Sequence, residues 1–195
     1  MANPFDIRLA TRSDEEQVAA TITLAFSADP IVRWIFPNPL MRLRTFMKLV
    51  GLYGGRALDH GSAHVIGDFA AVALWLPPGV EPEVEKMRRL FAETVPAEIL
   101  STYLSQSERI SAHHPSEPHW YLPLIGVDAG HQGKGYGTVL MAHGLAVCDR
   151  EQKLAYLEST NRANLSLYER FGFRLLAEVR IGDSPSKFAM LRDPQ

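Results

Sequence analysis

Three glycines stand at alternate positions in the stretch GHQGKGYGTVL, residues 130–140, directly before an apolar pattern with helical spacing. Gly133, Gly135 and Gly137 have no Cβ, so a ligand can approach the backbone closely there. The first turn of a helix leaves its N–H groups unpaired and lies at the positive end of the helix dipole. Such amides favour an anion, most often a phosphate. The pattern therefore predicts a phosphate-binding loop that opens a helix running to about Arg150.

Two common phosphate motifs do not fit this spacing. A P-loop has the pattern G-x-x-x-x-G-K-[ST], but Asp128 stands at its first glycine and Gly135 at its final Ser or Thr. A dinucleotide fingerprint has the spacing G-x-G-x-x-G, whereas these glycines follow G-x-G-x-G. The strand before the loop is also not the first strand of a doubly wound sheet. Both motifs are excluded on spacing.

A third pattern, Q/R-x-x-G-x-G/A, fits residues 132–137, which follow the strand end LIGVDAGH. It resembles the pyrophosphate-binding motif of the GNAT acetyltransferase superfamily. The later stretch NRANLSLYERFGF, residues 161–173, resembles that superfamily's N-x-x-A/N…L-Y-E-x-x-G-F segment. Within the superfamily, four stretches resemble the puromycin N-acetyltransferase type of enzyme: residues 7–30, 70–79, 119–137 and 156–173. Residues from about 80 to 115 have no such match.

The resemblance implies a mixed α/β (α+β) fold, the GNAT fold, as a single domain over residues 1–195. Its central twisted sheet is mostly antiparallel, with six to seven strands, one parallel splayed pair and flanking helices. The residue pattern agrees with this architecture. We expect strands at 5–11, 117–128, 154–160, 173–181 and 187–193, and a hairpin at 62–79 that turns at Gly67-Asp68. We expect helices at 12–26, 40–58, 81–95, 96–114 and 161–172 besides the one after the glycines, with a loop or short helical turn at 27–39. A capping box of Ser13 and Glu16 is expected to start the first helix.

The resemblance also implies where acetyl-CoA binds. Its pantetheine arm would lie between two splayed strands, residues 119–127 and 154–160, and its pyrophosphate on the glycine loop. The expected cofactor-binding residues are Ile125, Val127, Gln132, Gly133, Lys134, Gly135, Tyr136, Gly137, Thr138, Asn161 and Asn164. Asn161 and Asn164 have an alternative interpretation as turn and N-cap residues.

Two side chains are candidates for catalysis. Tyr168 matches the superfamily's general-acid tyrosine, which would give a proton to the departing thiolate. Glu158, in YLEST, resembles the glutamate that the puromycin-type enzymes carry there, as a base or as a water-holding group. The structural alternatives are a packing role for Tyr168 and a solvated or salt-bridged strand position for Glu158.

The aromatic residues suggest an acceptor pocket. Trp34, Phe36, Trp75 and Trp120 are expected mostly in the core, with one or two lining a pocket for an aromatic amine. We expect this pocket between the first two helices and the final strand pair, with a floor that draws on Phe26, Trp34 and Trp75. The predicted function is acetyl transfer to a primary amine of a small molecule, a puromycin-like antibiotic being one such acceptor, and hence antibiotic resistance. The alternatives are a protein or peptide N-acetyltransferase and a non-catalytic acyl-CoA-binding module.

Composition narrows the partners. The formal net charge of −2 gives no basic field for nucleic acid. The longest apolar run, residues 69–76, is too short to span a membrane as a helix, and the N-terminal residues have no apolar core of a signal peptide, so we expect a cytoplasmic protein without a membrane partner. Cys148 is expected to be a buried structural thiol. The histidines at 113, 114 and 119 match no zinc spacing and are interpreted as loop residues around Pro115 and Pro118, where the expected helix 96–114 gives way to the expected strand 117–128. No metal is expected in the site. We expect a monomer or homodimer.

Overall fold

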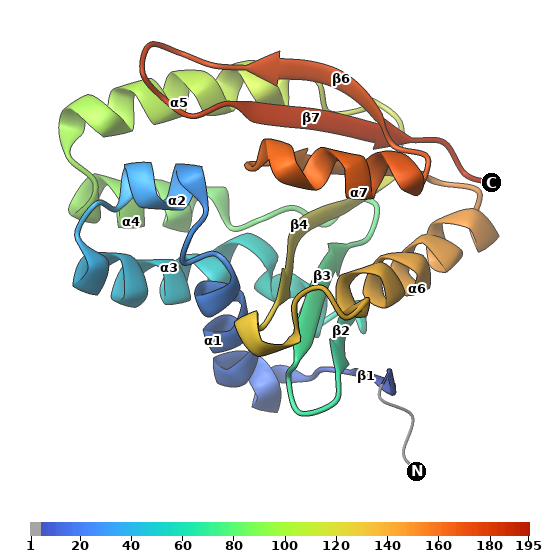
Figure 1. Cartoon of the computed structure of the whole chain (residues 1–195). Helices are drawn as coiled ribbons and strands as arrows, with labels where there is room; N and C mark the ends of the chain where they lie inside the picture. The colour runs from blue at the N-terminus through green and yellow to red at the C-terminus, as the bar shows by residue number, and fades with distance from the viewer. Residues whose placement is uncertain (1–4) are drawn as a thin grey trace.

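The computed structural model describes residues 5–195, which form a seven-stranded mixed sheet with helices on both faces (Figure 1). The strands are β1 (Ile7–Leu9), β2 (Ala63–Ile66), β3 (Ala71–Leu76), β4 (His119–Val127), β5 (Leu154–Ser159), β6 (Arg174–Val179) and β7 (Lys187–Arg192). The helices are α1 (Glu15–Ala25), α2 (Pro30–Ile35), α3 (Pro39–Gly54), α4 (Val84–Thr94), α5 (Ala97–Ser111), α6 (Tyr136–Arg150) and α7 (Leu165–Arg170). The expected fold class is confirmed.

The order of the strands in the sheet is β1-β2-β3-β4-β5-β7-β6. Every neighbouring pair is antiparallel except β4 and β5. Parallel neighbours need a crossover connection, and α6 supplies it. The glycine loop lies directly between β4 and this crossover helix, as the sequence predicts.

The two faces of the sheet carry separate apolar clusters. Alternate residues of β3 show the division, because Val72 and Leu74 pack into the cluster under α1 to α5 while Ala73 and Trp75 pack into the cluster under α6 and α7. Figure 1 shows α6 and α7 on the face opposite to α2 and α3. No helix within residues 5–195 is both long and apolar enough to cross a membrane.

The parallel strands separate part of the way along. β4 pairs with β5 only between residues 119–122 and 154–157, and beyond that point the strands continue without pairing to each other. Pro123, the first residue past the paired stretch, has no N–H to donate. At the same place Leu74 lies opposite Leu124 and Leu76 opposite Tyr121, so one residue of β3 stands against two of β4. This bulge and the proline open the sheet at its centre.

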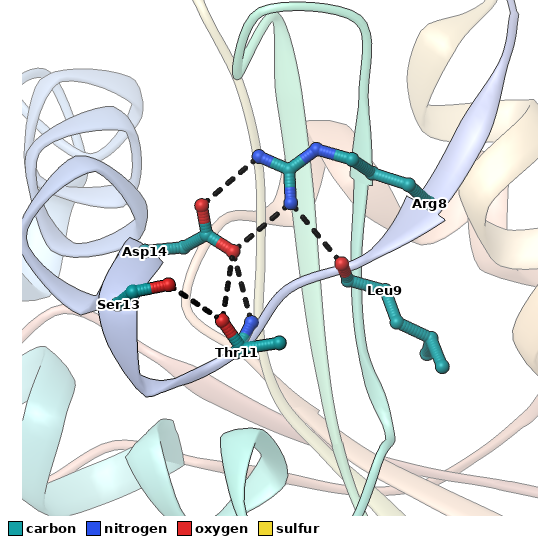
Figure 2. Close-up of polar contacts among 5 residues, drawn as sticks. All are labelled: Arg8, Leu9, Thr11, Ser13 and Asp14. Carbon is teal, nitrogen blue, oxygen red and sulfur yellow. Dashed lines mark hydrogen bonds and ion pairs between the residues drawn. The ribbon is translucent and has the colours of Figure 1, made fainter.

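The start of the first helix differs from the expected Ser13–Glu16 capping box. Figure 2 shows that the side chain of Asp14 closes the turn, where the N–H of Thr11 donates to its Oδ2 over 2.9 Å. Arg8 of β1 donates to both oxygens of Asp14, over 2.9 and 3.0 Å. Because of this guanidinium and the Thr11 amide, the pKa of Asp14 is lowered to about 2. A 3₁₀ turn at Arg12–Asp14 therefore leads into α1, and β1 is tied to the helix that follows it.

Candidate active site

A cavity of about 710 Å³ starts at the glycine loop, passes the opening between β4 and β5, and ends among α2, α3 and β7. We call its first part the glycine end, formed by residues of 132–138 together with Asn161 and Asn164. We call its other part the aromatic end, lined by Phe26, Asp29, Ile31, Val32, Ile35, Phe36, Phe46, Leu49, Tyr53, Met87, Tyr103, Glu158 and Lys187. Tyr168 also lines the cavity. The two parts form one space.

The backbone at the glycine end requires glycine. Gly133 and Gly135 have φ angles of +72° and +89°, and Gly135 is the N-cap of α6. A side chain at either position would be strained. An ideal Cβ at Gly133 would meet no atom within 4 Å, and one at Gly135 would meet only Phe5 Cζ, at 3.9 Å. The loop therefore presents bare backbone to open space.

The loop amides are available to a ligand. None of the backbone N–H groups from Gln132 through Thr138 donates to an acceptor within residues 5–195. They lie before and in the first turn of α6, where the helix dipole favours negative charge. A pyrophosphate fits this set of donors, so the residues present suit coenzyme A.

Two polar side chains of the loop bond to its own backbone. Lys134 Nζ donates to the carbonyl of Gly130 over 2.8 Å, and Lys134 does not line the cavity. Gln132 Nε2 donates to the carbonyl of Val127 over 3.1 Å. These contacts brace the loop against the end of β4, so a phosphate contact by Lys134 stays a prediction.

The other expected cofactor residues lie along the same cavity wall. Ile125 and Val127 are on the part of β4 that no longer pairs with β5, and both line the cavity. Asn161 accepts a hydrogen bond from the N–H of Ala163 over 3.0 Å and so caps the 3₁₀ turn Arg162–Asn164, as its alternative interpretation expects. The side chain of Asn164 is exposed and makes no hydrogen bond within the described part of the chain, which leaves it free for a ligand.

Tyr168 is a buried side chain of α7, 6% exposed. Its hydroxyl has no hydrogen-bond partner among residues 5–195. The hydroxyl oxygen is not fully buried, since it does not belong to the buried polar atoms that lack a partner, and Tyr168 lines the cavity. Burial, and second the charge of Asp29, raises the pKa of Tyr168 to about 12. The hydroxyl therefore stays protonated at neutral pH and can donate into the cavity.

Asp29, which the sequence interpretation missed, is a buried carboxylate at the aromatic end. It caps α2, since Oδ1 accepts the N–H of Val32 over 3.0 Å, and Oδ2 accepts the hydroxyl of Thr160. Burial raises the pKa of Asp29, and the hydrogen bond from Thr160 opposes that shift. The D-P pair at 29–30 signals a helix N-terminus, but nothing local in the sequence indicates that the carboxylate faces a cavity.

Glu158 lies on β5 with its side chain only 10% exposed. Its Oε1 is 3.2 Å from Nε2 of His114 and accepts the hydroxyl of Tyr156 over 3.3 Å. The Glu158 charge also contributes to raising the pKa of Tyr53 and Tyr121, after burial. The hydroxyls of these two tyrosines bond to each other. Glu158 is therefore held in a network of hydroxyl and imidazole groups.

His114, the last residue of the expected helix 96–114, follows α5 in an irregular segment, which agrees with its interpretation as a loop residue. Its contact with Glu158 was not foreseen. The imidazole also packs on Tyr156, with ring centroids 4.1 Å apart, and on Tyr121 at 5.0 Å. Tyr121 and Tyr156 come from the paired strands β4 and β5, and His114 comes from the segment that follows α5.

Only Phe26 of the three residues predicted for the acceptor floor lines the cavity. Trp34 packs against the core and does not line the cavity. The prediction for Trp75 is wrong, because the alternation of β3 places its ring on the other face of the sheet. There it fills the space above Gly144 of α6, where an added Cβ would lie 2.2 Å from the indole nitrogen.

Neither Cys148 nor the His, Asp and Glu side chains of residues 5–195 form a reactive-thiol or metal site apart from this cavity. Cys148 is buried, as expected, and burial raises its pKa to about 12. Residues 5–195 hold no group of three or more His, Cys, Asp or Glu side chains placed to bind a metal ion. A site without a metal stays a prediction.

Comparison with known proteins agrees with this geometry. Residues 101–173 match the model of the acetyltransferase (GNAT) family. An uncharacterized N-acetyltransferase of Schizosaccharomyces pombe is 25% identical over 93% of this chain and 81% of its own length. A Corynebacterium glutamicum structure described as a histone acetyltransferase HPA2 and related acetyltransferase has a TM-score of 0.70 at 24% identity, over 99% of this chain and 98% of that one. The polyamine N-acetyltransferase of Drosophila melanogaster has a TM-score of 0.68 at 16% identity, over 97% and 99%.

Proposed function

We propose that this chain, which has the GNAT fold, is an acyltransferase that moves the acetyl group of acetyl-CoA to a primary amine of a small molecule. The observation that carries this proposal is the single cavity. It is lined at one end by backbone suited to a pyrophosphate and at the other by aromatic and ionisable side chains, with Tyr168 also in its wall. Both substrates can therefore meet within one space.

In the proposed complex, the amides of residues 132–138 hold the pyrophosphate, and the unpaired edge of β4 at Ile125 and Val127 holds the pantetheine arm. Acetyl-CoA supplies a thioester that an amine can attack. The attacking amine has to be neutral, and its nitrogen has to lose one proton once the new carbon–nitrogen bond has formed. Glu158 lines the cavity and is the carboxylate proposed to accept it, directly or through a water.

Tyr168 is proposed to complete the proton balance. As the carbon–sulfur bond breaks, the departing thiolate gains a proton from the hydroxyl, and the amide product keeps the acetyl group. The high pKa of Tyr168 keeps the proton available until the thiolate forms. A thiol, with an ordinary pKa near 8.5, is a stronger acid than Tyr168, so the step is completed when the tyrosinate regains a proton from solvent, one for the proton that Glu158 takes from the nitrogen.

A small acceptor is favoured over a peptide by the walls of the aromatic end. Phe36, Phe46 and Leu49, from the end of α2 and from α3, are buried side chains that give this end of the cavity an apolar wall. A non-catalytic acyl-CoA-binding protein would need neither a buried tyrosine donor such as Tyr168 nor a carboxylate such as Glu158 in the lining of the same cavity. A puromycin-like acceptor, and with it a role in antibiotic resistance, is the finer form of the proposal.

The test is release of coenzyme A thiol from acetyl-CoA with a panel of amines. The panel includes puromycin, arylalkylamines, a polyamine and a peptide with a free N-terminus. Turnover with a small amine, and little with the peptide, is the expected outcome. Turnover with the peptide alone would overturn the small-molecule proposal, and binding of acetyl-CoA without transfer to any amine would favour the non-catalytic alternative.

A further inference from the structure

Lys187 is a buried cation at the aromatic end. It is the first residue of β7, is 5% exposed and lines the cavity. Lysine is almost never buried to this extent without a partner of opposite charge. Its surroundings therefore require an explanation.

The direct partners of Lys187 are neutral groups of α5. Its Nζ donates to Ser107 Oγ over 3.0 Å and lies 4.3 Å from the centroid of the Tyr103 ring. No carboxylate within the described residues comes within ion-pair distance of this ammonium. The charge of Lys187 acts on Asp29 only at longer range, and it is the smallest of the influences that lower the pKa of Asp29.

The same strand offers a matched contrast. Arg192, at the other end of β7, is 3% exposed and donates to both oxygens of Asp149, over 2.6 and 2.9 Å. Arg192 does not line the cavity, and the fold provides its carboxylate. Lys187 does line the cavity, and the fold provides none. An uncompensated buried charge is costly, so an anion entering the cavity would be favoured beside Lys187.

The position of Lys187 relative to Glu158 limits what that anion can be. Glu158 pairs with Ala189, which lies two residues from Lys187 on β7. Residues two apart on a strand share a face and are roughly 6–7 Å apart. A group bound at Lys187 therefore lies a few bonds from an amine that reacts near Glu158. The wall beside it includes the apolar or aromatic side chains of Phe36, Met87 and Tyr103.

We propose that Lys187 forms an anion subsite within the acceptor pocket, and that the acceptor is an amino carboxylate, an amino acid with an apolar side chain, rather than a simple amine. This inference rests on the proposed function for the identity of the amine. The carboxylate would take the place of the missing ion-pair partner of the Lys187 ammonium. Lys187 is thus a specificity-determining residue.

The experiment compares matched acceptors that differ only in a carboxylate. Phenylalanine and phenethylamine form one pair, and leucine and isopentylamine another. The parent enzyme is expected to prefer the carboxylate member of each pair in kcat/KM. Lys187→Met should lower kcat/KM for the carboxylate members by about 30–5,000-fold, the range for losing one partner of a buried charge pair, and for the uncharged members by about threefold or less. Lys187→Arg should keep the preference in weakened form.

A binding measurement tests the subsite without turnover. N-acetylphenylalanine and N-acetylphenethylamine, the two products, are titrated by calorimetry into the parent and Lys187→Met proteins in the presence of coenzyme A. Tighter binding of the carboxylate product to the parent, lost in Lys187→Met, supports the subsite even where no amine of the panel is turned over. Equal binding of both products by the parent overturns it. Failure of the wider function appears instead as absence of acetyl transfer to any amine.

Ser107→Ala is the control for a purely structural role. It removes the contact that ties Lys187 to α5 but keeps the charge, so the carboxylate preference should survive. If Ser107→Ala and Lys187→Met lower the melting temperature alike and leave the preference of the parent unchanged, Lys187 serves only to join β7 to α5 and the proposal is wrong.

Discussion

The glycine end of the cavity offers a ligand mainly backbone groups, whereas the aromatic end offers side chains. The glycine end consists mainly of one stretch of the chain, residues 132–138, whose functional groups are backbone amides beside glycines with positive φ, and Asn161 and Asn164 are its two other members. The aromatic end draws side chains from segments far apart in the chain, and Asp29, Tyr53, Glu158 and Lys187 are ionisable groups among them. Conformation fixes what the glycine end binds, whereas charge and proton positions decide what happens at the aromatic end.

This difference means that the ends should fail differently. A change of backbone conformation at the glycine end should weaken binding of acetyl-CoA and leave the chemistry of the bound complex intact. A change of one ionisable side chain at the other end should alter turnover, acceptor choice or pH dependence with little effect on acetyl-CoA. Substitutions at each end can therefore separate binding from chemistry.

The largest effect is expected for Tyr168→Phe, which removes the hydroxyl but keeps the ring packed against Phe173. A general acid contributes about 10²–10⁴-fold in rate, so kcat should fall by that factor while the KM for acetyl-CoA changes little. Steady-state kinetics on a variant with an unchanged melting temperature is the measurement. Turnover within about twofold of the parent would show that the hydroxyl is not the acid.

The pH dependence sharpens the same assignment. An acid acts in its protonated form, so activity is lost as the pH rises through its pKa. Because the pKa of Tyr168 is raised to about 12, kcat of the parent should show no loss of this acid between about pH 8 and about pH 10, although an ordinary tyrosine titrates near 10. A decline with a midpoint near pH 10 that disappears in Tyr168→Phe would show that the hydroxyl is not shielded by burial.

The next largest effect is expected for Gly135→Val at the glycine end. Valine at a φ of +89° is strained and would turn its branched side chain toward the space that the phosphates need. The Kd for acetyl-CoA should rise by about 10–100-fold, the equivalent of about 1–3 kcal/mol. Gly61→Val is the matched control, since Gly61 has a φ of +63° and does not line the cavity. Equal loss of affinity in both variants, or in neither, would contradict the prediction.

Gly137 differs from the other two glycines of the loop, because its φ is not positive. It lies within the first turn of α6, and an added Cβ would meet Val127 Cγ2 at an ordinary distance of 3.5 Å. The alternate spacing of the glycines suggests three equivalent positions, but the structure requires positive φ only at Gly133 and Gly135. A Gly137 variant therefore tests ligand approach alone.

How far the sequence predicts the molecule follows from the same division. The strands, the helices and the glycine loop are local or periodic features, so the sequence indicates them well, whereas the parallel pair is expected only from the family resemblance. The aromatic end depends on which segments the sheet brings together. His114 reaches Glu158 across 44 positions, and Asp29 reaches Thr160 across 131, so no spacing rule predicts either contact. Trp75 was misplaced because an apolar run buried on both faces does not show which face each residue takes.

A smaller effect is expected for His114→Asn. The change removes the imidazole at Oε1 of Glu158 but leaves the hydrogen bond from Tyr156. One hydrogen bond contributes about 0.5–1.5 kcal/mol, so kcat/KM for the amine should fall by about 3–10-fold, with the KM for acetyl-CoA unchanged. His113→Asn, at the exposed neighbouring histidine, is the control. Equal values for the two variants would mean that His114 does not position Glu158.

The smallest effect is expected for Asp29→Asn, and it concerns stability. Asparagine is also a good N-cap, so the N–H of Val32 keeps an acceptor. Burial raises the pKa of Asp29 in the folded chain, so the folded state binds this proton more tightly than the unfolded state does. The stability that this proton contributes is present at low pH and is lost as the pH rises through the folded pKa. At neutral pH the parent therefore holds a buried charge that the variant lacks. The melting temperature of Asp29→Asn should equal or exceed that of the parent near pH 7, and the difference should shrink as the pH falls and the parent's carboxylate becomes protonated.

Asp68→Asn, in the exposed turn between β2 and β3, is the control for losing a carboxylate. A variant less stable than the parent, by a margin that widens as the pH rises, would show that Thr160 and Val32 more than offset the burial of this charge.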